Sequence, residues 1–254
     1  MDLKLKSRRA LVTGGTRGIG RAIAFGFAAE GADVAICARD AKAVTETVEG
    51  LKKKGVQAFG QALDVADGAK LAAFVAAAAE ALGGLDIVVA NASALSEGAG
   101  AEAFRRAFET DLMHTRNLAE AAIPHLAKSG GGSIVAISSI SGSEDYGYDG
   151  VSYGAMKAAL FFYVKSLARH VAPKGIRANA VSPGTTYFKG GHWHKVELED
   201  PKGFAETIAA NPMGRMATPE EIANVVVFLS SAAASFVSGT NVVVDGTMTT
   251  RIPN

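Results

Sequence analysis

A tyrosine and a lysine stand four residues apart in the stretch SYGAMK, at Tyr153 and Lys157. Side chains at positions i and i+4 of a helix lie on one face, one turn apart. A free tyrosine, with a pKa of ~10, holds its proton too tightly for acid–base catalysis at neutral pH, and a nearby ammonium lowers that pKa. The spacing therefore fits a proton donor tuned by a cation, although a packed tyrosine and an exposed lysine on an ordinary helix give the same pattern.

The elements that must position this pair alternate along the chain. Short apolar runs, typical of buried parallel strands, are separated by longer Ala-rich amphipathic segments. The predicted strands are residues 9–13, 33–38, 56–61, 85–90, 133–138, 176–181 and 241–246, and the predicted helices are 18–30, 41–54, 67–82, 102–128, 152–171 and 219–231. We see no linker or internal repeat. We therefore expect one α/β domain over residues 1–254, a doubly wound parallel sheet with helices on both faces.

Composition narrows the kind of partner. The 254 residues include 26 Lys and Arg against 25 Asp and Glu, which argues against a nucleic-acid or membrane-surface binder. Cys37 is the only cysteine, and His192 and His194 lack a third ligand, so we expect no disulfide framework and no metal site. No apolar run reaches the ~18 residues of a membrane span, and the start MDLKLKSRRA lacks the apolar core of a signal peptide. We expect a cytoplasmic protein that acts on a small molecule.

A glycine-rich turn follows the first predicted strand, with Gly14, Gly18 and Gly20 in TGGTRGIG. Glycines let the backbone approach a pyrophosphate closely, and the N-terminus of the following helix favours its negative charge. The spacing differs from G-x-G-x-x-G, and turns in general use glycine. The position between a strand and an apolar helix nevertheless predicts a dinucleotide site.

The end of the second predicted strand, where Arg39 and Asp40 follow Ala38, bears on the choice of cofactor. An acidic residue there binds the ribose 2′-hydroxyl of NAD(H), whereas an arginine meets the 2′-phosphate of NADP(H). Arg17 in the glycine turn adds a second guanidinium, and guanidinium groups form strong bonds to phosphate. We expect NADP(H) rather than NAD(H). The alternative is that Arg39 is solvated and Asp40 only caps a helix.

Residues 184–212 break the alternation of strands and helices. This stretch is long, rich in glycine in its first half and holds the only tryptophan, so it is predicted to be a substrate lid or binding loop; the alternative is a structured surface insertion without a ligand role. Aromatic residues in it, and shortly before the catalytic tyrosine, favour an apolar or aromatic substrate. These candidate substrate residues are Tyr146, Tyr148, Tyr187, Phe188 and Trp193.

Five motifs carry a family resemblance. TGGTRGIG (13–20), NAS (91–93), ISS (137–139), YGAMK (153–157) and SPG (182–184) occur in the order and spacing of the short-chain dehydrogenase/reductase family, which the chain resembles from Arg9 to about Gly246. The resemblance implies a Rossmann-type sheet of seven parallel strands in the order 3-2-1-4-5-6-7. It also implies a homo-oligomer, often a tetramer, and the run FFY at 161–163 would suit a subunit interface.

The resemblance also implies roles for individual residues. Tyr153 would donate the proton, Lys157 would tune it and bind the nicotinamide ribose, and Ser139 would bond the substrate oxygen, with Ser138 and Ser141 as structural alternatives. The implied cofactor-binding residues, besides Tyr153 and Lys157, are Gly14, Thr16, Arg17, Gly18, Ile19, Gly20, Arg39, Asp64, Val65, Asn91, Ala92, Pro183, Gly184 and Thr186.

Three positions depart from the family pattern. Asp111 stands where the family often has an asparagine, the fourth member of a proton relay that acts through its backbone carbonyl on a water near the lysine. An aspartate keeps that carbonyl but adds a carboxylate that would raise the lysine pKa or pair with it. Ser93 and Thr247 replace family glycines, and we expect neither to abolish activity.

Three functions compete at this point. The first is an NADP(H)-dependent carbonyl reductase or alcohol dehydrogenase. The second is a 3-oxoacyl thioester reductase acting on acyl-carrier protein, although the near-neutral charge gives no sign of the basic patch such a partner would need. The third is a non-catalytic dinucleotide sensor, against which the intact Ser139, Tyr153 and Lys157 argue, because a sensor has no need of a tuned phenol.

Overall fold

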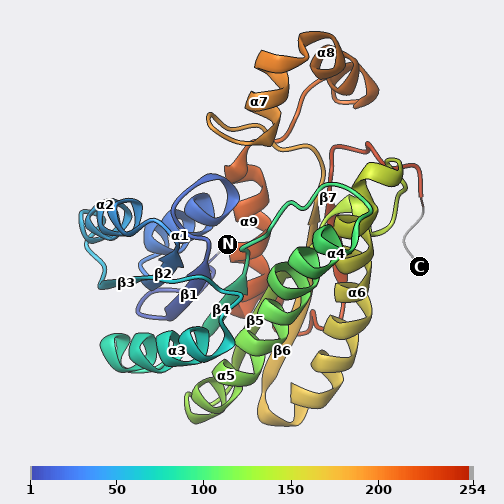
Figure 1. The fold of residues 1–254 in the computed structure, drawn as a ribbon. Coiled ribbons are helices and arrows are strands. Elements are labelled where there is room, and N and C mark those ends of the chain that lie inside the picture. The colour runs from blue at the N-terminus through green and yellow to red at the C-terminus, as the bar shows by residue number, and fades with distance from the viewer. Residues whose placement is uncertain (1, 252–254) are drawn as a thin grey trace.

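Seven parallel strands form one sheet in the computed structural model, which describes residues 2–251 (Figure 1). Their order, β3-β2-β1-β4-β5-β6-β7, is the order that the family resemblance implies. The strands are β1 (Arg9–Thr13), β2 (Asp33–Ala38), β3 (Ala58–Ala62), β4 (Ile87–Ala90), β5 (Gly132–Ile137), β6 (Ile176–Pro183) and β7 (Asn241–Val244). The predicted bounds of β1 and β2 are confirmed, while β3 begins at Ala58 rather than at residue 56.

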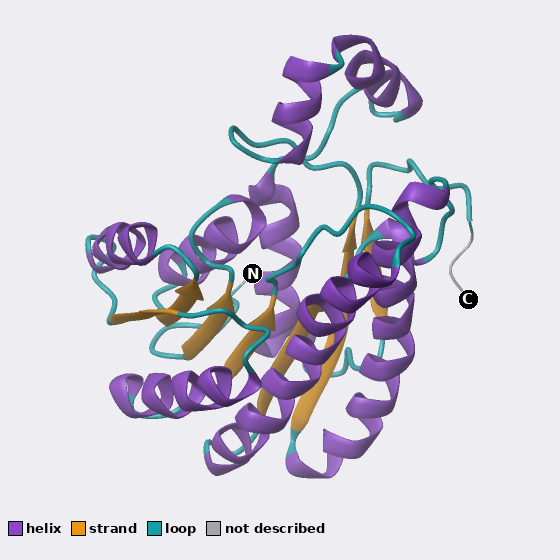
Figure 2. Ribbon diagram, in the orientation of Figure 1, coloured by secondary structure: helices purple, strands orange, loops and turns teal. Residues whose placement is uncertain are grey.

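Helices cover both faces of the sheet (Figure 2). One face packs against α3 (Gly68–Leu82), α5 (His114–Lys128) and α6 (Val151–Val171), and the other against α1 (Gly18–Ala29), α2 (Ala41–Lys52) and α9 (Pro219–Ser230). Successive side chains of a strand point to opposite faces, so a strand buried on both sides must be apolar throughout. In β1, the side chain of Leu11 packs in the core on the side of α3, α5 and α6, whereas those of Ala10 and Val12 pack in the core on the side of α1, α2 and α9.

The strand order reverses next to β1, which pairs with β2 on one side and with β4 on the other. In doubly wound sheets the crevice at such a reversal, at the carboxyl ends of the strands, is the usual ligand site. Here the loops after β1, β4, β5 and β6 all leave the sheet at that end and carry the predicted site residues. The topology therefore gathers motifs that lie far apart in the sequence.

The predicted helix 102–128 is not one uninterrupted α-helix. It consists of α4 (Ala101–Ala107), a π-helical segment (Phe108–Met113) and α5. A π-helical turn holds more residues than an α-helical turn, and such turns are frequent at functional sites. This one contains Asp111, which is 1% exposed and faces α6. The widened turn is thus the local structure that carries the departing residue of the relay.

The segment 184–212 contains two helices, α7 (His192–Glu199) and α8 (Pro201–Ala210), which stand beyond the carboxyl ends of the strands in Figure 1. The sequence pattern predicts a lid or loop here and does not reveal the two helices. Asp200 separates the two helices, and its side chain accepts from the backbone N–H of Gly203 at 3.0 Å, with Pro201 in the first turn of α8. This aspartate–proline pair is a typical helix start.

The remaining helical turns are short 3₁₀ segments at Ile140–Gly142, Tyr148–Gly150, Ala172–Lys174 and Ala232–Ala234. Across residues 2–251, none of the helices combines the length and the apolar character that a membrane crossing requires.

Candidate active site

The glycine turn between β1 and α1 has the geometry of an anion site. Gly18 has a φ of +51°, a left-handed conformation that favours glycine, and a β-carbon on Gly20 would collide with the carbonyl oxygen of Gly14. Arg17 is the N-cap of α1, and its side chain makes no capping hydrogen bond within the described chain. The first N–H groups of α1 therefore keep their capacity to bind an anion at the positive end of the helix.

Two arginines stand beside this turn. Arg17 and Arg39 are both exposed, both line the cavity described below, and neither has a salt-bridge partner among residues 2–251. Asp40, in contrast, caps α2 by accepting from the backbone N–H groups of Lys42 and Ala43 at 2.9 and 3.1 Å. One oxygen of this carboxylate, Oδ1, is thus bound in the helix cap although Asp40 also lines the cavity, while both guanidinium groups remain open to a phosphate.

A cavity of about 1170 Å³ runs along the carboxyl ends of the strands and joins the glycine turn to the tyrosine and lysine of α6. Most of the predicted site residues contribute to its wall. They are Gly14, Thr16, Arg17, Ile19, Gly20, Arg39, Asp64, Val65, Asn91, Ala92, Ser139, Tyr146, Tyr153, Lys157, Pro183, Gly184, Thr186, Phe188 and Trp193. The glycine cradle, the open guanidinium groups and the size of this cavity fit a nicotinamide dinucleotide.

Asn91 joins the two strands that flank the reversal. Its backbone N–H donates to Thr13 Oγ1 at 3.0 Å, and its side-chain amide donates to the Thr13 carbonyl at 2.9 Å. The predicted support of the sheet by this asparagine thus has a definite geometry, in which the carboxyl ends of β4 and β1 are tied together.

Four predicted site residues do not line the cavity. Gly18 lies beneath Phe188, since a β-carbon added to Gly18 would be 2.5 Å from Cζ of that ring, and Asp111 is buried behind Lys157. Tyr148 is 76% exposed. Tyr187 packs within the lid segment, where its hydroxyl donates to Glu197. The positions of the two tyrosines depend on packing in loops and short helices, so the sequence reading overestimated how many aromatic side chains reach the cavity.

Tyr153 and Lys157 contribute to the same wall of the cavity from α6. Tyr153 is half-buried, Lys157 is only 2% exposed, and Lys157 Nζ lies 5.4 Å from the centroid of the Tyr153 ring. The two side chains are thus close enough to meet the same ligand in the cavity. The arrangement can thus support proton transfer between the phenol and a ligand in the cavity.

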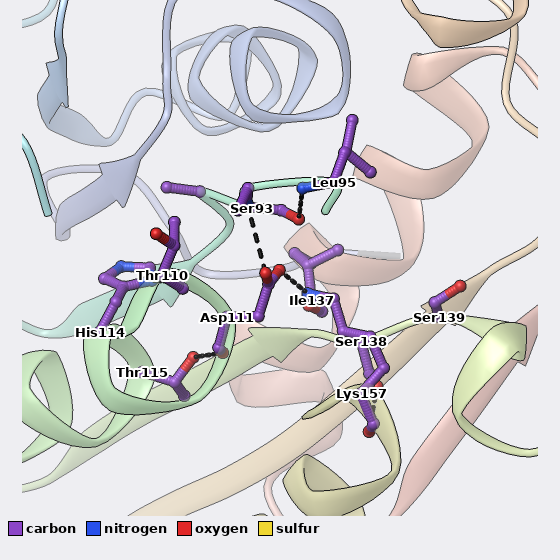
Figure 3. A network of polar contacts seen from close by, with 12 residues as sticks. Ser93, Leu95, Thr110, Asp111, His114, Thr115, Ile137, Ser138, Ser139 and Lys157 are labelled. Atoms are coloured by element: carbon purple, nitrogen blue, oxygen red, sulfur yellow. Dashed lines mark hydrogen bonds and ion pairs between the residues drawn. The ribbon is translucent and has the colours of Figure 1, made fainter. Parts of the chain in front are cut away.

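Lys157 is held by two oxygens (Figure 3). Its Nζ donates to the Ile137 carbonyl at 2.9 Å and forms an ion pair with Asp111 Oδ1 at 3.1 Å, and Asp111 Oδ2 accepts from the backbone N–H of Ala94 at 3.3 Å. Burial lowers the pKa of Lys157, but the neighbouring Asp111 carboxylate and Tyr153 phenol together outweigh burial, so this pKa lies above its ordinary value. The lysine therefore stays charged inside the protein.

The two serines that directly follow β5 have different partners. Ser138 Oγ donates to the Lys157 carbonyl at 2.8 Å, which ties β5 to α6. Ser139 is 8% exposed and lines the cavity, and its Oγ accepts from the backbone N–H of Ser141 at 3.1 Å. This bond fixes Ser139 Oγ at the wall, and the hydroxyl proton can still be donated to an oxygen in the cavity.

His114, at the start of α5, is drawn in Figure 3 near Thr110, on the side of Asp111 away from Lys157. It is fully buried, and its Nδ1 lies 3.1 Å from the Thr110 carbonyl, so Nδ1 carries the proton. Burial, followed by the charge of Lys157, lowers the pKa of His114 to about 4, and the ring is neutral at pH 7. The carbonyl of Asp111, expected to hold a relay water, accepts from Thr115 Oγ1 at 3.1 Å.

Several residues of the cavity wall were not identified from the sequence. Four of them come from the loop after β4, the turn after β5, α8 and the segment after β7: Leu95, Ile140, Thr207 and Met248. No motif marks them, because their places depend on how the lid segment and the C-terminal segment fold over the sheet. Only Leu95 and Ile140 had a signal, since each follows closely after a predicted strand.

Fold and site together define a dinucleotide-binding oxidoreductase, and comparison with known proteins identifies its family. The family model described as Enoyl-(Acyl carrier protein) reductase matches residues 14–249. Isoepoxydon dehydrogenase from Penicillium expansum is 41% identical over 251 residues, which cover 95% of each chain. 7alpha-Hydroxysteroid dehydrogenase from Escherichia coli strain K12 is 32% identical over 252 residues, 96% of this chain and 95% of that enzyme.

A solved structure gives the same result. L-Sorbose reductase from Gluconobacter frateurii, complexed with NADPH and L-sorbose, superposes with a TM-score of 0.94 at 34% identity and covers 99% of this chain and 100% of that one. The chain belongs to the short-chain dehydrogenase/reductase family. It is an oxidoreductase that uses a nicotinamide dinucleotide and acts on CH–OH or C=O groups.

Proposed function

We propose that this protein reduces a ketone with NADPH, or oxidises the corresponding secondary alcohol with NADP⁺, and that Tyr153 is the proton donor. The observation that carries the proposal is the placement of Tyr153 and Lys157 on one face of α6, in the same cavity as the glycine turn. The substrate that we propose is apolar or aromatic.

Tyr153, Ser139 and Lys157 each have a defined task in the proposal. The bound nicotinamide supplies the hydride that reaches the carbonyl carbon. Tyr153 donates its phenolic proton to the oxygen, which gains negative charge as the carbonyl is reduced. Ser139 donates a hydrogen bond to the same oxygen. Lys157 stabilises the phenolate that remains, and its charge is maintained by Asp111.

The choice of NADP(H) is supported by the two open guanidinium groups. Arg17 and Arg39 border the cavity without acidic partners in the described part of the chain, and Asp40 is engaged in the cap of α2. A 2′-phosphate between two guanidinium groups would make charge-assisted, often bidentate bonds. The relative crystallised with L-sorbose was bound to NADPH.

The substrate class is supported by apolar side chains that line the same cavity as Tyr153. Tyr146, Phe188 and Trp193 contribute aromatic surface, and Leu95 and Met248 add apolar surface. The relative from Escherichia coli is named for a steroid alcohol, which is a large apolar substrate. We propose that residues 184–212, with α7 and α8, form the lid that closes over this end of the cavity.

A screen for NADPH depletion tests the function directly. The panel contains aryl ketones, cyclic ketones and 3-oxoacyl thioesters, each with NADPH and with NADH. We expect turnover with an aryl or cyclic ketone and preference for NADPH. Turnover restricted to acyl thioesters would instead support the acyl-carrier reductase. NADPH binding without turnover on any carbonyl would favour the non-catalytic sensor.

The cofactor preference gives the first specific prediction. Arg39→Asp removes one guanidinium and places a carboxylate near the expected 2′-phosphate, so the ratio of kcat/KM for NADPH to that for NADH should fall about 10- to 100-fold. Arg169→Asp, at an exposed position of α6 outside the cavity wall, is the matched control and should leave the ratio unchanged. An unaltered ratio in Arg39→Asp would remove Arg39 from cofactor selection.

We further propose a cytoplasmic homo-oligomer, a tetramer or a dimer. The single cysteine, Cys37, is buried and free, as suits a reducing compartment. Phe162 is 80% exposed on α6, and an apolar side chain at such a position suits a subunit interface. Cell fractionation tests the location, and a monomeric mass in light scattering would contradict the oligomer.

A further inference from the structure

We propose that Asp111 is a positioning residue that keeps Tyr153 and Lys157 in their proton-donating form to higher pH, and thereby adapts this site to carbonyl reduction near neutral pH. The inference rests on the proposed function, in which Tyr153 gives its proton to the substrate oxygen. Asp111 does not line the cavity within the described chain, so it acts through Lys157 rather than on the substrate.

The ion pair is largely buried, and of its two members only Lys157 borders the cavity. The side chain of Lys157 is 2% exposed and that of Asp111 is 0% exposed, with 3.1 Å between Nζ and Oδ1. Charges in such a setting are little screened, so each strongly affects the protonation of its neighbours. The Asp111 carboxylate is therefore placed to affect the protonation of both Tyr153 and Lys157.

The direction of this effect does not depend on which group loses its proton first. Ketone reduction requires a protonated phenol on Tyr153 and a charged ammonium on Lys157. A negative charge at Asp111 favours both the phenol proton of Tyr153 and the ammonium proton of Lys157. Without that charge, the first of these two protons should leave at a lower pH. Coupled groups of this kind share their titration, and the sign of the change holds for the pair as a whole.

Within residues 2–251, few other charged groups contact the ion pair of Asp111 and Lys157. From the start of α5, His114 is neutral at pH 7, because burial and then the charge of Lys157 lower its pKa to about 4. From β5 the pair meets the Ile137 carbonyl, and from the loop after β4 it meets the Ala94 N–H; neither group titrates. Glu97, Glu102 and Glu109 line the same cavity, but within residues 2–251 Asp111 is the carboxylate that forms an ion pair with Lys157.

The consequence concerns the direction of the reaction. A dehydrogenase working on the alcohol needs the phenolate as a base, whereas a reductase needs the phenol as an acid. A buried carboxylate that retains the proton extends the pH range of reduction upward and delays alcohol oxidation to more alkaline pH. An amide at position 111 would do the reverse.

The test is the pH profile of kcat/KM for ketone reduction at saturating NADPH, from about pH 6 to about pH 10. In Asp111→Asn the alkaline limb should move about 1 to 2 pH units toward neutrality, while the rate on the acid side stays within roughly tenfold of wild type. Asp111→Glu keeps the charge and should keep the limb near its original position. A purely structural role would lower the rate by the same factor at every pH, and that result would overturn the proposal.

Asp86→Asn is the matched control, because it makes the same change at another buried, ion-paired aspartate that lies outside the cavity wall. Its alkaline limb should not move. If both variants shift the limb equally, the shift reflects weakened folding and not the charge beside Lys157, and the proposal fails.

A second measurement needs neither substrate nor turnover. ¹³C-labelled lysine and tyrosine are titrated by NMR in the cofactor-free protein, with Lys157→Met and Tyr153→Phe assigning the two signals. The first of the two groups to titrate should do so at lower pH in Asp111→Asn than in wild type. An unchanged first step overturns the role of Asp111, whereas absence of turnover on every carbonyl overturns the proposed function alone.

Discussion

Two buried aspartates lie at opposite ends of the sheet, and their surroundings differ. Asp86 precedes β4 at the amino end and accepts from the backbone N–H of Arg9 at 2.9 Å, from Arg9 Nε at 2.7 Å, from Arg9 Nη2 at 3.1 Å and from Arg8 Nη1 at 3.1 Å. Asp111, near the carboxyl end, has one backbone hydrogen bond, at 3.3 Å, and its ion pair with Lys157. One carboxylate is fully satisfied and the other is not.

The number of partners around a buried charge decides whether it serves structure or chemistry. A carboxylate with a bidentate guanidinium and a backbone N–H is fixed in one geometry, which joins β1 to the start of β4. Despite its burial, the bonds from Arg9 hold the pKa of Asp86 below its ordinary value. At the carboxyl end of the sheet, the ion pair of Asp111 and Lys157 has fewer partners, and Lys157 borders a cavity. The protonation of this pair can therefore respond to pH and to a ligand.

Breaking the pair at the carboxyl end should have the largest effect. Lys157→Met leaves Asp111 buried without its cation, so the free energy of unfolding should fall by about 3–5 kcal/mol. Turnover should fall ~100- to 1000-fold, because the phenol loses the ammonium that stabilises its ionised form. Urea denaturation and NADPH consumption measure the two losses.

A double variant separates the two roles of this pair. Lys157→Met combined with Asp111→Leu replaces both charges with apolar groups, which is often neutral for stability in buried pairs. Most of the lost free energy of unfolding should return while turnover stays low. If the double variant is no more stable than Lys157→Met, the burial of an unpaired carboxylate is not the cause of the loss.

Breaking the pair at the amino end should affect stability alone. Asp86→Asn removes a charge that Arg8 and Arg9 bind, so the free energy of unfolding at pH 7 should fall by ~2–3 kcal/mol. The kcat/KM profile should keep its shape. A displaced pH limb in this variant would mean that the two ends of the sheet are not independent.

The pH dependence of that loss follows from the direction of the Asp86 shift. Because its pKa is lowered on folding, its contribution is present above the unfolded value of ~3.9 and is lost as pH falls through the folded value. The difference in unfolding free energy between wild type and Asp86→Asn should therefore shrink below about pH 4. A difference that stays constant into acid would show that the charge does not contribute.

The fold could be predicted because its signals are local and repeated. β1 and β2 are short, apolar and bounded by turn residues, and their observed bounds equal the predicted ones. The π-helical segment at Phe108–Met113 could not be predicted, because its residues are compatible with an ordinary α-helix. The segment places Asp111 against Lys157 of α6, a contact between elements that the local sequence does not reveal.

The site divides in the same way. Tyr153, Lys157 and the glycine turn could be placed in advance, because the helical period and the strand-to-helix turn fix their directions. The sequence left open whether Asp111 would pair with the lysine or act through its carbonyl, and the structure shows the pair. Tyr187 was predicted to contact substrate, but its bond to Glu197 belongs to the internal packing of the lid segment.

A single turnover of Tyr153→Phe with NADPH and a ketone identified in the screen shows whether the phenol of Tyr153 delivers the proton. NADPH binding, followed by its fluorescence, should stay within about threefold of wild type, while the rate of NADPH consumption falls ~1000-fold or more. A Tyr153→Phe protein that consumes NADPH at nearly the wild-type rate would contradict the account.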